Sequence, residues 1–250
     1  MEVRSFLFSL NKNEKVKGSI MGFIYFIIVV GLIIFVPYKK FRDSKYEEAS
    51  GNGFFATLFD KGNYGEYLTF SLLKNISIHK RLMTNLYIPN KDGKITEIDL
   101  LLITETGLYV FESKNYSGWI FGDERYKNWT QTFPNKHKNQ FFNPIWQNKG
   151  HINALKQKLE LTENDLYKSY IIFSERCTLK KVQIHSPEVK VLKRNELAKT
   201  INIDIKSSSK ILTPSQVDQI YVRLNKYTKV DDIIKKVHID QIKNRKKSGA

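Results

Sequence analysis

The chain has 250 residues, which is enough for one domain of moderate size with additional segments at its ends. Its formal net charge of +16 favours a polyanionic partner, either nucleic acid or an anionic membrane surface, although a lysine-rich bias of the organism is an alternative explanation. The single cysteine, Cys177, excludes an intrachain disulfide, and the sequence has no Cys/His cluster with zinc-site spacing. It also has no phosphate-binding glycine-rich loop and no nucleophile elbow.

The first predicted element is an apolar helix at residues 18–38, which contain no charged residue and are flanked by lysines on both sides. About twenty apolar residues span a bilayer core as a helix. A cleavable signal peptide would have a shorter apolar core and a small-residue cleavage site. We therefore predict an uncleaved transmembrane helix that follows a basic N-terminal segment, residues 1–17. A buried core helix is disfavoured by the length of the segment and by its apolar residues on all faces.

The orientation of this helix does not follow from charge, because basic residues are as frequent just before it as just after it. The basic, disulfide-free remainder of the chain favours a single-pass protein of the cell membrane whose later residues lie in the cytoplasm. Residues 39–60 are charged and then rich in Gly and Asn, which predicts a short linker. The apolar side chains at positions 54, 55, 58 and 59 either pack on the domain or lie in the membrane interface.

The rest of the chain predicts an α/β fold, with a mixed sheet flanked by helices. Helices are expected at residues 65–75, from the N-cap Asn143 and Pro144 onward, at 196–201 and at 213–227. Strands are expected at residues 82–88, 98–103, 108–114, 170–173 and 189–192, with a hairpin formed by 119–122 and 127–133. Residues 206–250 are expected to form a linker, the last of these helices and a basic tail.

Charged side chains lie near the ends of two neighbouring strands. Asp99 is on the first, and Glu112 and Lys114 are on the second, on one face, because strand side chains alternate. A short turn would make the strands antiparallel, with Asp99 beside Glu112. Two carboxylates, helped by the Ser113 carbonyl, suit Mg²⁺, and Lys114 can orient a metal-bound water or stabilise negative charge. The alternative is a solvated salt bridge at a sheet edge.

The chain also resembles the NERD (nuclease-related) domain, a branch of the PD-(D/E)xK nuclease superfamily. The matching pieces occur in the order of the family: Gly65 and Glu66 on a helix, 97–99 on a strand, 107–115, 116–122, Trp129 and 143–151. We place the nuclease-like domain at residues 61–205, with its core at 63–175. One departure is that Ile98 precedes Asp99, where the superfamily signature has proline.

The resemblance implies a restriction-endonuclease-like fold and a nuclease that acts on DNA with Mg²⁺ or Mn²⁺. It places Asp99 and Glu112 at the metal positions and Lys114 at the catalytic lysine. Glu66 takes the helix-borne acidic position, and Gln147 takes the polar position on the following helix. One alternative is a catalytically inactive module that tethers nucleic acid to the membrane, and another is a membrane protein whose basic surface meets lipid or protein.

Lysines around the predicted site are candidates for binding phosphate groups: Lys136, Lys138, Lys149, Lys180 and Lys181. Aromatic residues between them, Trp119, Trp129, Phe141 and Phe142, can stack on bases, although core packing is the favoured role of each one. His151 lies four residues after Gln147, on the same helix face. Contact with substrate is possible for His151, but packing against the sheet as a satisfied polar residue is favoured.

Overall fold

The computed structural model describes residues 2–90 and 93–247, and the chain divides after Lys45 into two compact units. Its helices are α1 (Glu2–Ser44), α2 (Tyr46–Ser50), α3 (Phe54–Phe59), α4 (Lys61–Lys74), α5 (Pro144–Leu159), η1 (Asn164–Leu166), α6 (Arg194–Ser207), α7 (Pro214–Asn225) and α8 (Asp232–Lys247). Its strands are β1 (Lys80–Pro89), β2 (Ile95–Thr104), β3 (Gly107–Lys114), β4 (Gly118–Asp123), β5 (Asn128–Thr132), β6 (Lys138–Phe142), β7 (Tyr167–Phe173), β8 (Cys177–Gln183) and β9 (Val189–Lys193).

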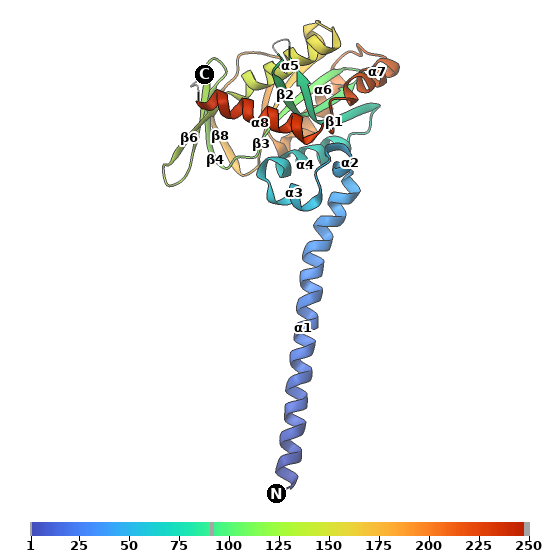
Figure 1. Cartoon of the computed structure of the whole chain (residues 1–250). Helices are drawn as coiled ribbons and strands as arrows, with labels where there is room; N and C mark the ends of the chain where they lie inside the picture. The colour runs from blue at the N-terminus through green and yellow to red at the C-terminus, as the bar shows by residue number, and fades with distance from the viewer. Residues whose placement is uncertain (1, 91–92, 248–250) are drawn as a thin grey trace. The chain divides into compact units, whose positions relative to one another are not determined.

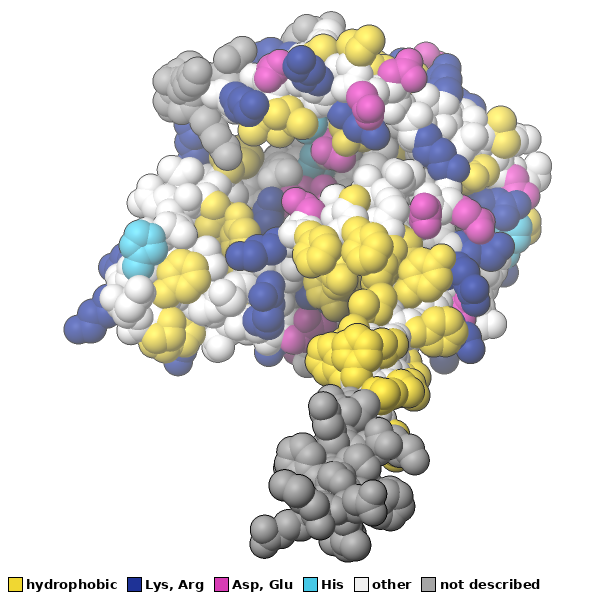
Figure 2. All heavy atoms as spheres, turned by 60° about the horizontal axis from the view of Figure 1, so that its bottom comes forward, with side chains coloured by type: hydrophobic (Ala, Val, Ile, Leu, Met, Phe, Trp, Pro, Cys, Tyr) yellow, Lys and Arg dark blue, Asp and Glu magenta, His cyan; other side chains and the backbone are white. Residues whose placement is uncertain are grey.

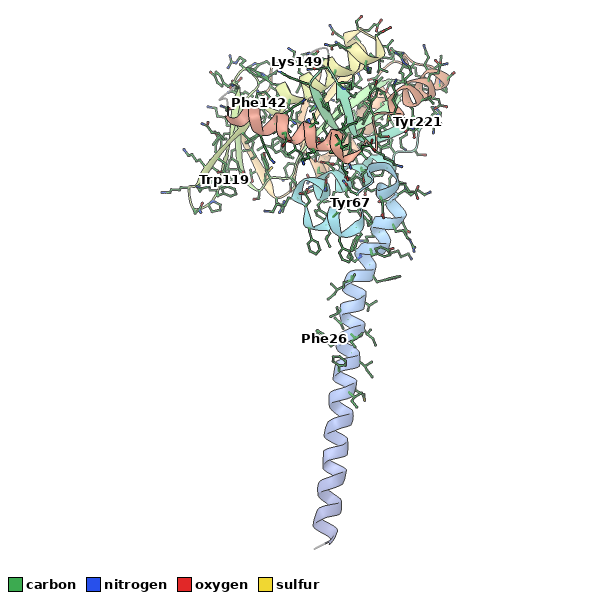
Figure 3. All side chains as sticks on the ribbon, in the orientation of Figure 1. Phe26, Tyr67, Trp119, Phe142, Lys149 and Tyr221 are labelled. Atoms are coloured by element: carbon green, nitrogen blue, oxygen red, sulfur yellow. The ribbon has the colours of Figure 1, made fainter. Side chains whose placement is uncertain are left out.

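The first unit contains the long helix α1. Within it, the segment Ile20–Ser44 contains an 18-residue stretch with a mean hydropathy of 2.8 and is long and apolar enough to cross a membrane. Its apolar side chains point outward, and Phe26, labelled in Figure 3, is 62% exposed. The predicted apolar helix at 18–38 is therefore confirmed as a candidate membrane span, and it lies within a helix that continues to Ser44.

The second unit is built on a sheet with the strand order β1-β2-β3-β7-β9 in the described part of the chain. Its first three strands are antiparallel, and β3, β7 and β9 are parallel. On one face, Leu155 of α5 and Val217 of α7 pack in one cluster with Val110. On the other face, the Tyr170 hydroxyl donates to Asp204 of α6. Figure 1 shows α5 and α4 on opposite sides of the sheet, which confirms the predicted mixed sheet flanked by helices.

A second sheet has the order β6-β5-β4-β8, counted over the same described residues. The predicted hairpin is confirmed as the antiparallel pair β4 and β5. Trp129 joins this sheet to the first, because its ring stacks on Phe173 with a centroid distance of 6.1 Å and an interplanar angle of 3°. Position 122 must be glycine for this packing, since a Cβ atom there would lie 2.1 Å from the Trp129 ring.

Two neighbouring chain segments cross from the first sheet to the second and run in the same direction: β3 to β4, and β7 to β8. β3 pairs in parallel with β7 in the first sheet, and β4 pairs in parallel with β8 in the second. The pairing continues at the crossing, where the Ser174 amide donates to the Lys114 carbonyl at 3.0 Å. Lys114, at the end of β3, is therefore held where both segments leave one sheet and enter the other.

The segment 39–60, expected as a linker, is largely helical, with α1 continuing to Ser44 and α2 and α3 following. Tyr46 orders this segment, because its ring packs edge-on against Phe70 of α4 at 5.4 Å. At the other end, α6 continues into the expected linker at 206–210, and the expected basic tail forms α8 up to residue 247. α8 is held in part by tertiary contacts, since Gln241 accepts a hydrogen bond from the Ile95 amide at 3.0 Å.

Glu124 holds the segment that follows β8 by accepting hydrogen bonds from its backbone. These bonds predict that the stability of the fold depends on pH. One carboxylate oxygen accepts hydrogen bonds from the amides of His185, at 2.5 Å, and Ser186, at 2.9 Å. Burial opposes ionisation of Glu124, but these bonds outweigh it and hold the pKa of the carboxyl below its usual range. A depressed pKa contributes stability above the unfolded-state pKa that is lost as the pH falls through the folded-state pKa.

We therefore expect the free energy of unfolding of Glu124→Gln to fall less steeply than that of the wild type between pH 7 and about 3. Denaturant unfolding at stepped pH, followed by tryptophan fluorescence, measures both curves. Parallel curves for the two proteins would show that the Glu124 contacts do not stabilise the fold.

Candidate active site

Strands β2 and β3 separate at the candidate site. Their ladder ends at the pair Leu100 and Phe111. Beyond this pair, an Asp99 carboxylate oxygen accepts a hydrogen bond from the Ser113 amide at 2.7 Å. The side chain of Asp99 thus replaces a backbone ladder bond, and it lies beside the strand end that carries Glu112, as the strand order predicts.

Glu112 and Lys114 form the centre of a buried polar network. Glu112 is 1% exposed, and its Oε1 accepts a hydrogen bond from the Lys114 Nζ at 2.5 Å. Its Oε2 lies 3.0 Å from the His151 Nε2, and the His151 Nδ1 lies 2.9 Å from the Thr96 hydroxyl. The Lys114 Nζ also donates to Gln147 Oε1 at 3.1 Å. Both α5 residues therefore contact the charged pair at the end of β3.

Glu66 is brought to the same place by a close approach of α4. A Cβ atom at Gly65 would lie 2.8 Å from the Asn115 Cβ, so glycine allows the helix to pack on the residue that follows β3. Buried Arg194 clamps this turn by donating to the Gly65 carbonyl at 2.9 Å. The next residue, Glu66, accepts a hydrogen bond from the Tyr46 hydroxyl at 3.3 Å. The glycine that precedes Glu66 is thus required by the close contact between α4 and Asn115.

The acidic side chains interact strongly. Burial, with the charges of Glu112 and Glu66, raises the pKa of Asp99 well above its usual range. Burial and the neighbouring Glu97 raise the pKa of Glu66 to about 8. Burial opposes ionisation of Glu112, but Lys114 and His151 together outweigh it and lower the pKa of that carboxyl. The site therefore combines one ionised, lysine-paired carboxylate with two neighbouring carboxyl groups that resist ionisation.

This donor set fits a divalent cation, because a bound cation relieves repulsion between neighbouring carboxylates. Mg²⁺ is bound through one or two carboxylates and keeps several waters. Asp99 and Glu112 are the residues that suit this role. Within residues 2–90 and 93–247, no three His, Cys, Asp or Glu side chains form a ready-made group of metal ligands, so waters would complete the coordination.

The structure gives the partners of further residues around the site, some of which were not predicted. The structure confirms that His151 is a buried, satisfied polar residue, and it adds that its partner is Glu112. Glu97 accepts a hydrogen bond from the Tyr87 hydroxyl at 2.5 Å and lies 3.6 Å from His238 of α8. The Glu-x-Asp spacing of residues 97 and 99 is a sequence signal for the acidic role of Glu97. The sequence held no comparable signal for His238.

The candidate phosphate-binding lysines lie apart from the acidic cluster. Four are exposed on the second sheet or its turns: Lys136, Lys138, Lys180 and Lys181. Lys149 is exposed on α5 (Figure 3), where it lines a cavity of about 780 Å³ whose lining does not include Glu66, Asp99 or Glu112. Of the aromatic candidates, Trp129 is buried, whereas Trp119 and Phe142 are 38% and 42% exposed.

Comparisons with known proteins identify the family to which the chain belongs. The family model described as "Nuclease-related domain", NERD, matches residues 61–174, which begin with α4 and end just after β7. An uncharacterised protein of Bacillus anthracis is 35% identical over 188 residues, which are 74% of this chain and 85% of that protein. No solved structure matches the chain. The chain therefore belongs to the NERD, or nuclease-related domain, family.

Proposed function

We propose that this protein is a membrane-anchored nuclease that uses Mg²⁺, or Mn²⁺, to hydrolyse phosphodiester bonds in DNA. Membership of the nuclease-related family supports the reaction class. The observation that carries the proposal is the buried Glu112–Lys114 ion pair of 2.5 Å, next to Asp99, where β2 and β3 separate. An acid pair with a neighbouring lysine supplies both metal ligands and a positively charged donor.

Each residue of the site has a distinct role in this proposal. Asp99 and Glu112 would hold the cation, which when bound would lower the pKa of a water ligand and neutralise charge on the phosphodiester. Gln147 and Glu112 take two hydrogen bonds from the Lys114 ammonium group, which has three hydrogens. The Lys114 side chain is 16% exposed, so its third hydrogen can reach the attacking water or a phosphate oxygen. Glu66 adds a further carboxyl group beside the metal position.

Charge and hydropathy support the choice of partners. The net charge of +16 favours a polyanion, and the exposed lysines of the second sheet offer phosphate contacts away from the acidic cluster. The segment Ile20–Ser44 supports anchoring, because it is long and apolar enough to cross a bilayer. We place the domain that follows it in the cytoplasm, where a basic, disulfide-free protein meets nucleic acid.

A cleavage assay on the full chain in detergent micelles tests this proposal. Single-stranded, linear duplex and supercoiled DNA and an RNA would be incubated with Mg²⁺, Mn²⁺ or EDTA. We expect metal-dependent cutting that falls at least about a hundred-fold in Asp99→Asn, because a ligand of the cation that would stabilise transition-state charge is weakened. Asp218→Asn is a matched control, since Asp218 is half exposed and paired with Arg81 on the first sheet. Equal cutting by Asp99→Asn and the wild type would exclude the mechanism.

The same assay separates the nuclease from a tethering module. A module that only binds would retain nucleic acid in EDTA, lose it steeply as salt rises and keep it after Asp99→Asn. Binding of this kind, without cutting under any metal or substrate, would replace the proposal with the tethering role. The ion pair between Glu112 and Lys114 favours the nuclease, because a phosphate-binding surface has no need of a buried acid.

A further inference from the structure

Helix α3 presents an apolar surface to solvent. Its sequence is FFATLF, and Phe55, Leu58 and Phe59 are 61%, 40% and 79% exposed. The Phe55 and Phe59 rings stack on each other with a centroid distance of 6.2 Å. Figure 2 draws these and the other hydrophobic side chains in yellow. Contiguous exposed apolar patches mark interaction sites rather than ordinary surface.

The inward side of α3 carries the buried Thr57, and the helix is closed by its own backbone bonds. Thr57 is 1% exposed and its amide donates to the Gly53 carbonyl at 2.9 Å. Asp60, directly after the helix, caps α4 by accepting a hydrogen bond from the Asn63 amide at 2.8 Å. Thr57 thus faces the domain, while Phe55, Leu58 and Phe59 face outward.

The chemistry of this surface fits lipid better than nucleic acid. Phe and Leu side chains have no hydrogen-bonding group, and α3 contains no lysine or arginine to meet a phosphate. Surfaces that stack nucleic-acid bases combine aromatic rings with a basic groove. Interfacial helices bury Phe and Leu in the boundary between headgroups and acyl chains, and their binding strengthens with the apolar area that they bury.

The chain itself brings α3 to a membrane. Phe54 follows Ser44, the last residue of the candidate membrane span, by ten residues. Ten residues reach at most about 35 Å when fully extended. Lys39, Lys40 and Arg42 near the end of the span suit anionic headgroups. The backbone of Phe54 therefore lies no more than about 35 Å from the end of the candidate membrane span.

We propose that the exposed face of α3, formed by Phe55, Leu58 and Phe59, inserts into the interface of the membrane that α1 crosses. This inference rests on the anchoring part of the proposed function. It gives the second unit two attachments to the lipid, the chain connection to α1 and the surface of α3. Because α4 begins at Lys61, directly after α3, the helix that carries Glu66 is then fixed relative to the membrane surface.

Nitroxide labelling of the full chain in nanodiscs tests this proposal. The discs would contain three parts phosphatidylcholine to one part phosphatidylglycerol. Labels at Phe59→Cys and Phe55→Cys report the environment of α3, and Val222→Cys on α7, where the native side chain is 70% exposed, is a matched control. The native Cys177 is 2% exposed, and unsubstituted protein measures its background labelling.

We expect both α3 labels to collide more often with oxygen, which dissolves in lipid, than with a water-soluble nickel chelate. The Val222→Cys label should show the opposite preference. An α3 label with the same preference as the control overturns the inference. A nickel-accessible α3 label that single-stranded DNA immobilises would assign the surface to nucleic acid, and spin–spin broadening would assign it to a second copy of the chain.

A third label separates this inference from the anchoring on which it rests. Phe26→Cys lies in the candidate membrane span. A lipid-exposed label at position 26 with water-exposed labels at positions 55 and 59 refutes only the role of α3. A water-exposed label at position 26 refutes the anchoring itself. Circular dichroism of each variant checks that the fold is retained.

Discussion

Replacing Lys114 with methionine is expected to slow cleavage strongly and to lower the free energy of unfolding by about 3–5 kcal/mol. The Glu112 side chain is 2% exposed, so its charge would remain buried without its closest partner. Cleavage should fall by about 10²- to 10³-fold, because the positive donor beside the reacting phosphate is lost. Single-turnover cleavage and denaturant unfolding measure the two effects. Unfolding is followed by tryptophan fluorescence, and all three tryptophans lie in the second unit.

A double variant separates stability from catalysis. Glu112→Gln combined with Lys114→Met removes both charges, and removal of a whole buried ion pair is often close to neutral for stability. We expect the double variant to recover most of the lost stability while its cleavage rate stays at the level of Lys114→Met. Recovery of cleavage together with stability would mean that the pair serves only the fold.

Replacing Trp129 with alanine is expected to cost about 3–5 kcal/mol, as for other buried aromatic side chains. The indole is 1% exposed, stacks on Phe173 and donates from its Nε1 to the Asp123 carbonyl at 3.0 Å. For a domain of about 200 residues, this corresponds to a fall in the melting temperature of roughly 6–20 °C. Thermal unfolding followed by far-ultraviolet circular dichroism measures the change.

Trp119→Ala is the matched control on the same hairpin. Trp119 is 38% exposed and its ring lies 5.9 Å from the Lys180 Nζ. Its removal should change the free energy of unfolding by less than about 1 kcal/mol, since an exposed cation–π contact contributes only that much. Equal destabilisation by the two variants would mean that the contact between the sheets is not the main support of the second sheet.

Regular hydrophobic patterns made much of the fold predictable. The apolar runs of β2 and β3, separated by a short turn, gave the antiparallel pair that carries Asp99 and Glu112. Asn143 and Pro144 marked the start of α5, and the structure shows the Asn143 side chain accepting from the Ile145 amide at 2.9 Å. In these segments, local sequence and tertiary packing favour the same structure.

Segments whose structure depends on pairing with distant parts of the chain could not be predicted from the sequence. β6 and β8 have mostly exposed side chains, and their pairing with β5 and β4 makes them strands. The packing of α8 is equally non-local, because Gln241 contacts Ile95 across 146 positions. Asp99, Glu112 and Lys114 could be named from their strand positions. The separation of β2 from β3, which places Asp99 against the Ser113 amide, was not visible in any pattern.

The parallel pairing of β3 with β7 also determines when the site can form during synthesis of the chain. Glu112 pairs with Ile171, and Lys114 pairs with Phe173. Contacts this distant in sequence form only after a long loop has closed. A nascent chain that ends before β7 already contains Glu66, Asp99, Glu112, Lys114 and Gln147. It lacks the strand that supports the charged pair, so the candidate site is completed long after the apolar helix at the start of the chain has been made.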